Sequence, residues 1–162
     1  MTRPTRAAFF SLCVASLVAH TTYAAEWRTY TATRFGAIAD VPGDWVMDPP
    51  PDNDDGRVFR SPNRQAQIVI GGSYMTDDVA SALRDAVSGI GVTYQRTGSD
   101  WAVASGVEGS RIFYRRSVIA CHNRIINTVE ITYPLSQKQV YDPLVEHVSK
   151  SLHSAQVSVE CR

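Results

Sequence analysis

The sequence has little cysteine, no excess of charge of either sign and no long hydrophobic run. Three cysteines in 162 residues are too few for the small scaffolds that disulfides hold together. The 16 basic residues balance the 16 acidic ones, which argues against a general nucleic-acid binder and a polybasic membrane binder. We therefore expect no nucleic acid as a partner and a chain that is not membrane-embedded, whose hydrophobic core provides most of its stability.

Motifs of the common catalytic and cofactor sites are also missing. No GxSxG surrounds Ser105 or Ser110, and the chain contains neither GxxxxGK[ST] nor HExxH. His122, His147 and His153 lack the spacing of zinc ligands on a helix. We expect no cofactor, no metal and no catalytic residues, which leaves a hydrolase without a recognisable motif as the weakest alternative.

The first residues have the pattern of a secretory signal peptide. Arg3 and Arg6 precede an uncharged run from Ala7 to Ala19, and Thr22 and Ala24 are small residues at the positions that a signal peptidase recognises. The run is too short for a membrane-spanning helix, which needs about 20 residues. We predict a signal peptide at residues 1–24, a single α+β domain at residues 25–162 and a periplasmic or secreted product.

Signal cleavage would leave two cysteines, Cys121 and Cys161. In an oxidising compartment such a pair predicts one disulfide, worth about 3–4 kcal/mol for a loop of this length in the chain-entropy model. The alternative is a reactive thiol beside His122, but neighbours on an extended chain point to opposite sides. The cleavage would also remove two basic residues and no acidic one, which makes the remainder mildly acidic.

Alternating and apolar segments predict strands, a helix, four further strands and a final helix. Thr76 with two following acids marks the start of the first helix, and the last helix starts at a Ser136–Gln139 capping box or at Asp142-Pro143. The predicted strands cover Trp27–Thr31, Phe35–Val41, Trp45–Val46, Gln65–Gly71, Val92–Thr97, Trp101–Val107, Arg111–Ala120 and Arg124–Tyr133.

The short breaks between the last four strands favour an antiparallel meander. Each predicted helix has a single apolar face, so both helices should pack on the sheet. The fold class that follows is α+β, with an antiparallel sheet that contains a four-strand meander and is covered by two helices.

The stretch "PPPDNDDGRVFRSP" resembles a calcium-binding loop. With Gly56 at the sixth position of an EF-hand, prolines stand where the first and twelfth ligands belong, and only Asn53 and Asp55 fit. Asp and Asn also favour turns, and Asp55-Gly56 suits a tight turn. We expect a turn, with a calcium site at Asn53 and Asp55 as the weaker alternative.

The segment "SRIFYRR", with Trp101 upstream, is the strongest candidate for a partner surface. On a strand, Arg111, Phe113 and Arg115 share one face, and arginine beside aromatic residues is typical of interaction surfaces. The candidate surface is therefore Trp101, Arg111, Phe113 and Arg115. Alternatively, the aromatics belong to the core and the arginines lie at a sheet edge. On either interpretation one of Phe113 and Tyr114 should be buried, because the two faces of the strand cannot both be exposed to solvent.

The opening "YTATRFGAIADVPGDW" resembles the start of PsbP-like domains, and the later meander and terminal helix agree with them in order. The stretches "NDDGRVFRS" and "SRIFYRR" are similar to small exported proteins of proteobacteria. The resemblance implies an α/β/α sandwich, also used by DcrB-type envelope proteins, whose members are mostly binding or accessory proteins.

These observations predict a soluble periplasmic, non-enzymatic protein that binds a partner or supports envelope assembly. The expected partner is an envelope protein or a small ligand. The alternative function is that of a secreted inhibitor or immunity-type protein that blocks a cell-wall enzyme.

Overall fold

The computed structural model describes residues 26–155 and 161, so the predicted signal peptide at residues 1–24 lies outside the described residues. In chain order the elements are β1 (Trp27–Thr31), β2 (Ala37–Pro42), β3 (Val46–Met47), β4 (Gly56–Arg60), β5 (Gln67–Tyr74), α1 (Val79–Ala86), β6 (Val92–Thr97), β7 (Trp101–Glu108), β8 (Arg111–Ala120), β9 (Ile125–Pro134), the 3-10 turn η1 (Leu135–Gln137), α2 (Lys138–Ser151) and β10 (His153–Ser154).

The larger sheet is antiparallel and has seven strands in the order β3-β4-β5-β9-β8-β7-β6. Strands β6 to β9 form the predicted four-strand meander, which is confirmed. The pairing of β5 with β9 joins the meander to the N-terminal half of the chain. The predicted fold class, an antiparallel α+β fold with two helices, is also confirmed.

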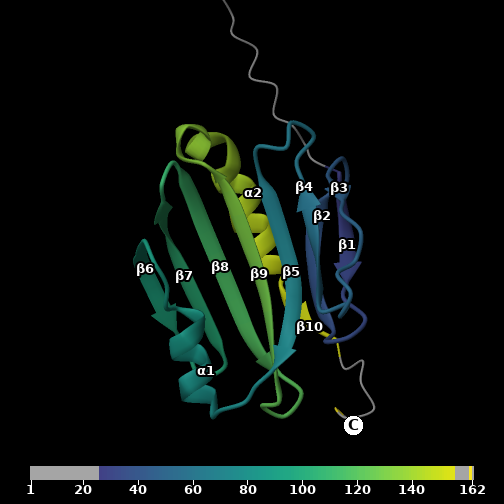
Figure 1. Cartoon of the computed structure of the whole chain (residues 1–162), viewed down its shortest axis with the longest axis vertical. Coiled ribbons are helices and arrows are strands. Elements are labelled where there is room, and N and C mark those ends of the chain that lie inside the picture. Colours follow the sequence, from purple (N-terminus) through teal and green to yellow (C-terminus); the bar gives the residue numbers. More distant parts are fainter. Residues whose placement is uncertain (1–25, 156–160, 162) are drawn as a thin grey trace, which may run out of the picture.

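The two helices lie on opposite faces of this sheet (Figure 1). On β9, buried and half-buried residues alternate along all ten positions, from buried Ile125 to half-buried Pro134. The buried residues, such as Val129 and Ile131, face α2 and its apolar residues Tyr141, Val145 and Val148, and the intervening residues face the side of α1. Strict alternation on the central strand therefore gives the sheet one dry face and one partly open face.

The two N-terminal strands and the short strand after α2 form a second, three-stranded sheet, β1-β2-β10, that the sequence analysis did not separate from the first. Ala37, Ala39 and Val41 of β2 are fully buried and pack beside α2 on the dry face of the larger sheet. Small side chains allow close approach of the two layers. Segment 35–41 was predicted to be a strand, and its apolar alternation indeed faces the core.

Both helix starts differ from the prediction. Asp78, not Thr76, caps α1, because its side chain accepts a hydrogen bond from Ser81 N. The last helix starts at Lys138, upstream of Asp142-Pro143 and without a side-chain cap, so neither proposed start is correct. Pro143 lies inside this helix, between the buried residues Tyr141 and Val145.

The predicted disulfide between Cys121 and Cys161 is confirmed, with 4.8 Å between the two Cα atoms. Cys161 is buried in a small cluster with Phe35 and Ile125, so the bond fixes the C-terminal end against the turn between β8 and β9. A disulfide is consistent with an oxidising compartment outside the cytoplasm. No helix within the described residues is long and apolar enough to cross a membrane.

We expect the protein to lose stability between about pH 10 and pH 12 because of Tyr133. Its side chain is 3% exposed and its hydroxyl donates to Asp142 Oδ1 at 3.2 Å. Burial, and then the negative charge of Asp142, raise the pKa of Tyr133 from 10.0 to about 12. The folded state therefore holds this proton more strongly than the unfolded chain, so its contribution is complete below pH 10 and is lost as the pH rises to 12.

Tyr133→Phe should remove this step, which is on the order of 2 kcal/mol. Urea titrations of wild type and variant from pH 8 to pH 11.5 would measure the difference. Tyr141→Phe removes the hydroxyl of the neighbouring ring, 5.3 Å away between centroids, and should keep the wild-type alkaline loss. Parallel curves for wild type and Tyr133→Phe would contradict the assignment.

Candidate binding groove

One face of the seven-stranded sheet is only partly covered. The eight residues of α1 lie over β7 and β8, where Phe113 packs against Leu83 and Val87. No helix of the described chain covers β4, β5 and β9 on the same face. There Val58 and Val69, which are directly opposite each other, are half-buried rather than buried.

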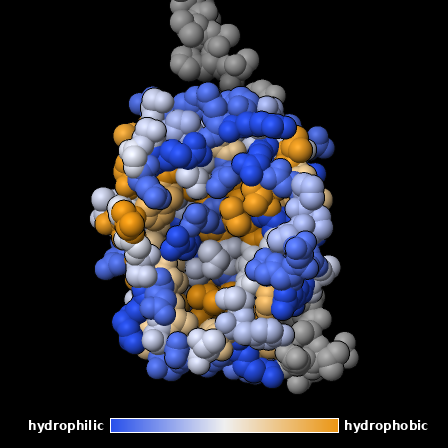
Figure 2. Space-filling view, viewed as in Figure 1, coloured by the Kyte–Doolittle hydropathy of each residue, from blue (hydrophilic) through white to orange (hydrophobic). Residues whose placement is uncertain are grey.

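Three hollows of about 500, 420 and 320 Å³ open on this face. The first and second share Glu130, the second and third share Arg115, and the first and third share Thr128, so the three hollows adjoin one another as one groove divided by these side chains. We call it the open-face groove; it crosses β4, β5, β9 and β8 between the segment Pro49–Pro51 and α1. Figure 2 shows this side of the molecule, where apolar patches lie among hydrophilic residues around a hollow.

An ion pair stands at the centre of the open-face groove. Arg115 of β8 and Glu130 of β9 are directly opposite each other in the sheet, and Arg115 Nε lies 2.7 Å from Glu130 Oε2. Both side chains are about 30% exposed, so the pair contributes about 1 kcal/mol or less to stability. Arg115 also donates to the carbonyl of Ala86 in the last turn of α1, which ties the helix to the groove.

Two glycines form a smooth part of the groove floor. Gly56 and Gly71 face each other on β4 and β5. A Cβ on Gly56 would lie 2.6 Å from the Ile70 carbonyl oxygen, and one on Gly71 would lie 2.5 Å from that of Asp55. The close backbone approach therefore requires glycine at both positions, and the missing side chains leave the hollow open.

The structure divides the predicted partner surface between the two faces of the sheet. Arg111 and Arg115 line the open-face groove, where Arg111 donates to the carbonyls of Gln65 and Thr132. Phe113 is only 8% exposed and belongs to the cluster under α1, so it is the buried aromatic that was expected on one face of this strand. The two arginines do not lie at a sheet edge, because β8 is paired on both sides. Trp101 pairs with Val118 and lies on the opposite face, so its expected grouping with the two arginines is wrong.

The acidic stretch forms a turn, as expected, but at a different place. Asp54 N donates to the Pro51 carbonyl, and Gly56 is already paired in β4, so the tight turn lies before Asp55-Gly56 rather than at it. The amide nitrogen of Asn53 donates to Asp55 Oδ2 at 2.7 Å. Within the described ranges, no three His, Cys, Asp or Glu side chains converge as metal ligands would. Asp55 instead lines the open-face groove, next to Gly56 on its floor.

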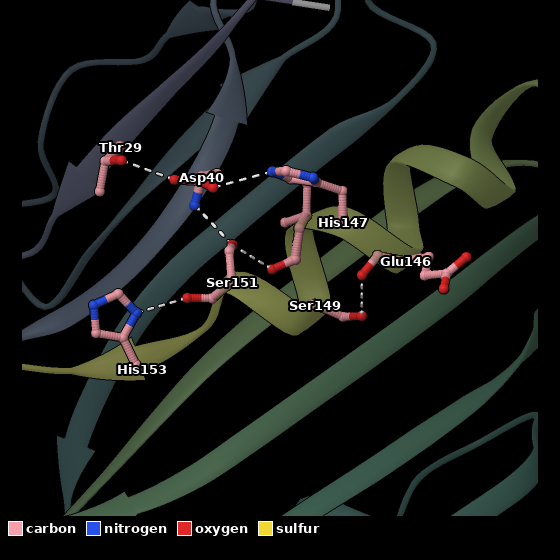
Figure 3. Close-up of polar contacts among 8 residues, drawn as sticks. Thr29, Asp40, Glu146, His147, Ser149, Ser151 and His153 are labelled. Carbon is pink, nitrogen blue, oxygen red and sulfur yellow. Dashed lines mark hydrogen bonds and ion pairs between the residues drawn. The ribbon is translucent and has the colours of Figure 1, made fainter.

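Another polar cluster lies on the far side of the molecule, between α2 and β2 (Figure 3). His147 Nε2 lies 3.0 Å from Asp40 Oδ2, and its ring stacks on Trp27 with 3.8 Å between centroids. Ser151 is near, but its oxygen accepts from Asp40 N and its hydroxyl donates to the Val148 carbonyl. The serine is thus bonded to backbone groups rather than to the histidine, and the cluster serves to join α2 to the small sheet.

Sequence reasoning did not identify Glu130 as part of a site. Thr128, Glu130 and Thr132 alternate with buried residues on β9, and this alternation was the available signal. The sequence around Val58 and Val69 did not indicate that these residues line a groove, because a short apolar strand does not show which face of the sheet stays uncovered.

The fold is of the PsbP/Mog1 type. It is similar to the solution structure of cyanobacterial PsbP (CyanoP) from Synechocystis sp. PCC 6803, with a TM-score of 0.60 and 12% identity over 83% of this chain and 96% of that one. It is also similar to the Ran-binding protein Mog1p of Saccharomyces cerevisiae, with a TM-score of 0.56 and 11% identity over 85% of this chain and 98% of that one. No family model and no curated protein matches the sequence. The predicted PsbP-like fold is confirmed, and identities this low establish the fold alone.

Proposed function

We propose that the protein is an exported, non-enzymatic binding protein of the periplasm or the extracellular space, and that it holds its partner in the open-face groove. The partner is an envelope protein or a small ligand. The observation that carries the proposal is the open-face groove itself, a group of three adjoining hollows on a sheet face that α1 leaves partly uncovered. Concave sites with apolar walls and a few placed polar groups are the usual form of binding pockets.

The groove has the chemistry of binding rather than of catalysis. Among the described residues that line it there is no histidine and no cysteine, and the carboxylate of Glu130 is already paired with Arg115. Pro49, Pro50, Val58 and Val69 provide apolar contact at one end. The described lining therefore contains no Ser–His or Cys–His pair of the kind that acyl transfer commonly uses.

Two further facts support the proposal. The disulfide suits an exported protein. Mog1p, which shares the fold, is a Ran-binding protein, so this architecture can support protein binding.

Val69→Arg should abolish binding in the groove with little effect on folding. Val69 is half-buried on the groove side between Val58 and Glu130, so a longer charged side chain would extend into the hollow of about 500 Å³. A photo-crosslinking residue at exposed Pro50 on the rim should form adducts in the envelope fraction, and Val69→Arg should reduce them at least tenfold.

The matched control is Val140→Arg on α2, where valine is 71% exposed and far from the groove. This variant should keep every adduct, and both variants should melt within a few degrees of wild type. A folded Val69→Arg protein with the wild-type adduct pattern would rule out the groove as the binding site.

A further inference from the structure

The seven-stranded sheet ends in a long unpaired edge. β6 pairs only with β7, five of its six residues are exposed, and Figure 1 shows it at the outer margin of the sheet. The opposite edge strand, β3, has only two residues. A long edge strand presents backbone groups to which another extended chain can bind.

The register shows which backbone groups point outward. Gly98 N donates to the Trp101 carbonyl, and hydrogen-bonded and non-bonded pairs alternate along an antiparallel ladder. Thr97 and Gln95 are therefore in non-bonded pairs with Ala102 and Ala104, and their N–H and C=O groups point away from β7. These two residues offer two donors and two acceptors to an incoming strand.

Beside this edge lies a group of aromatic and arginine residues on the sheet face opposite α1. Pairing of Arg96 with Val103, and of Val103 with Arg116, places the two arginines in one row across three strands. The Arg116 guanidinium lies over the Trp101 ring, 5.6 Å from its centroid, and Tyr94 of β6 is 49% exposed. We call Tyr94, Arg96, Trp101 and Arg116 the edge patch.

The charge of the edge patch is not balanced. Neither Arg96 nor Arg116 forms an ion pair within the described part of the chain, and Arg116 Nε is buried without a hydrogen-bond partner there. The residues that the register places on this face of β6, β7 and β8 include no acid. A second copy paired edge to edge would bring Arg96 near its own counterpart, which like-charge repulsion disfavours.

We propose that β6 binds an extended acidic polypeptide segment as an eighth strand of the sheet. The segment forms backbone hydrogen bonds with Gln95 and Thr97 and places a carboxylate beside Arg96. Arg116 adds positive potential, and Tyr94 and Trp101 provide aromatic contact of the kind found at interface centres. This site lies on a different edge and face from the open-face groove, and it does not depend on the function proposed for that groove.

A display library of random nine-residue peptides, selected on the immobilised protein, tests the proposal. Selected peptides should carry Asp or Glu at alternate positions, because alternate side chains of a strand share one face. A resynthesised peptide should bind Arg96→Glu at least tenfold more weakly than wild type, and its binding should weaken with added salt. Binding of the peptide should also slow amide hydrogen exchange at Gln95 and Thr97.

Gln95→Pro is the decisive variant. It removes an outward N–H without removing a β6–β7 hydrogen bond, and proline is tolerated on edge strands in this position. It should weaken peptide binding at least tenfold, whereas Gln95→Ala and the groove variant Val69→Arg should bind as wild type does. A failure to enrich any peptide, peptides without alternating acids, or equal binding to folded Gln95→Pro and Gln95→Ala would overturn the proposal.

Discussion

Phe113→Ala is expected to lower the free energy of unfolding by about 3–5 kcal/mol, the usual loss when a large aromatic side chain is removed from a core. Phe113 is 8% exposed and packs with Leu83, Val87, Ala102 and Ala104. This cluster is what attaches α1 to the sheet, because Leu83 is the one buried residue of the helix. Urea unfolding followed by circular dichroism would measure the loss.

The adjacent residue provides the matched control. Tyr114 lies on the opposite face of β8 and is half-buried at the margin of the main core, so Tyr114→Ala should cost clearly less than Phe113→Ala. A loss for Tyr114→Ala equal to or greater than that for Phe113→Ala would contradict this assignment of faces. Phe113→Leu, which retains most of the apolar volume, should recover most of the stability and keep α1 in place as a wall of the open-face groove.

The misplaced Trp101 shows that a site spanning two strands depends on their register. We expected a three-residue break, Glu108-Gly109-Ser110, between two strands, but the structure has a two-residue turn and pairs Glu108 with Arg111. From that pair the register follows, and Trp101 falls opposite Val118. A shift of one residue moves every side chain of a strand to the other face, and Trp101 had been grouped with Arg115 without a register between the two strands.

Other features depended on contacts that local sequence does not specify. The alternation on β9 predicted a strand with one buried face, and the structure agrees. The sequence did not predict that α1 would cover only β7 and β8. The apolar stripe of a helix shows which side of the helix is buried, but not the strands on which that side packs. The open-face groove exists because α1 covers only part of the sheet face. No single segment of the sequence therefore predicts the groove.

The disulfide, by contrast, followed from the sequence because only two cysteines remain after the predicted cleavage. Its removal is the second large effect that we expect. Replacing both cysteines in Cys121→Ser/Cys161→Ser should cost about 3–4 kcal/mol, because the bond closes a loop of 40 residues and so restricts the unfolded chain. Urea unfolding of the double variant and of reduced wild type should give the same lowered midpoint, with a steeper dependence on urea since the unfolded chain becomes less compact.

The loss should be uneven over the structure. Cys161 packs beside Phe35 and Ile125, whereas the neighbouring tail is held through β10 and a hydrogen bond from Ala155 N to the Gly36 carbonyl. Hydrogen exchange in the variant should accelerate at β10 and at the turn that follows β8, while amides of β5 and β9 open only with global unfolding. An unchanged urea midpoint would show that the bond contributes nothing to stability. Equal acceleration in β9 and β10 would show instead that it supports the whole core, because local release of the tail leaves the pairing of β5 with β9 intact.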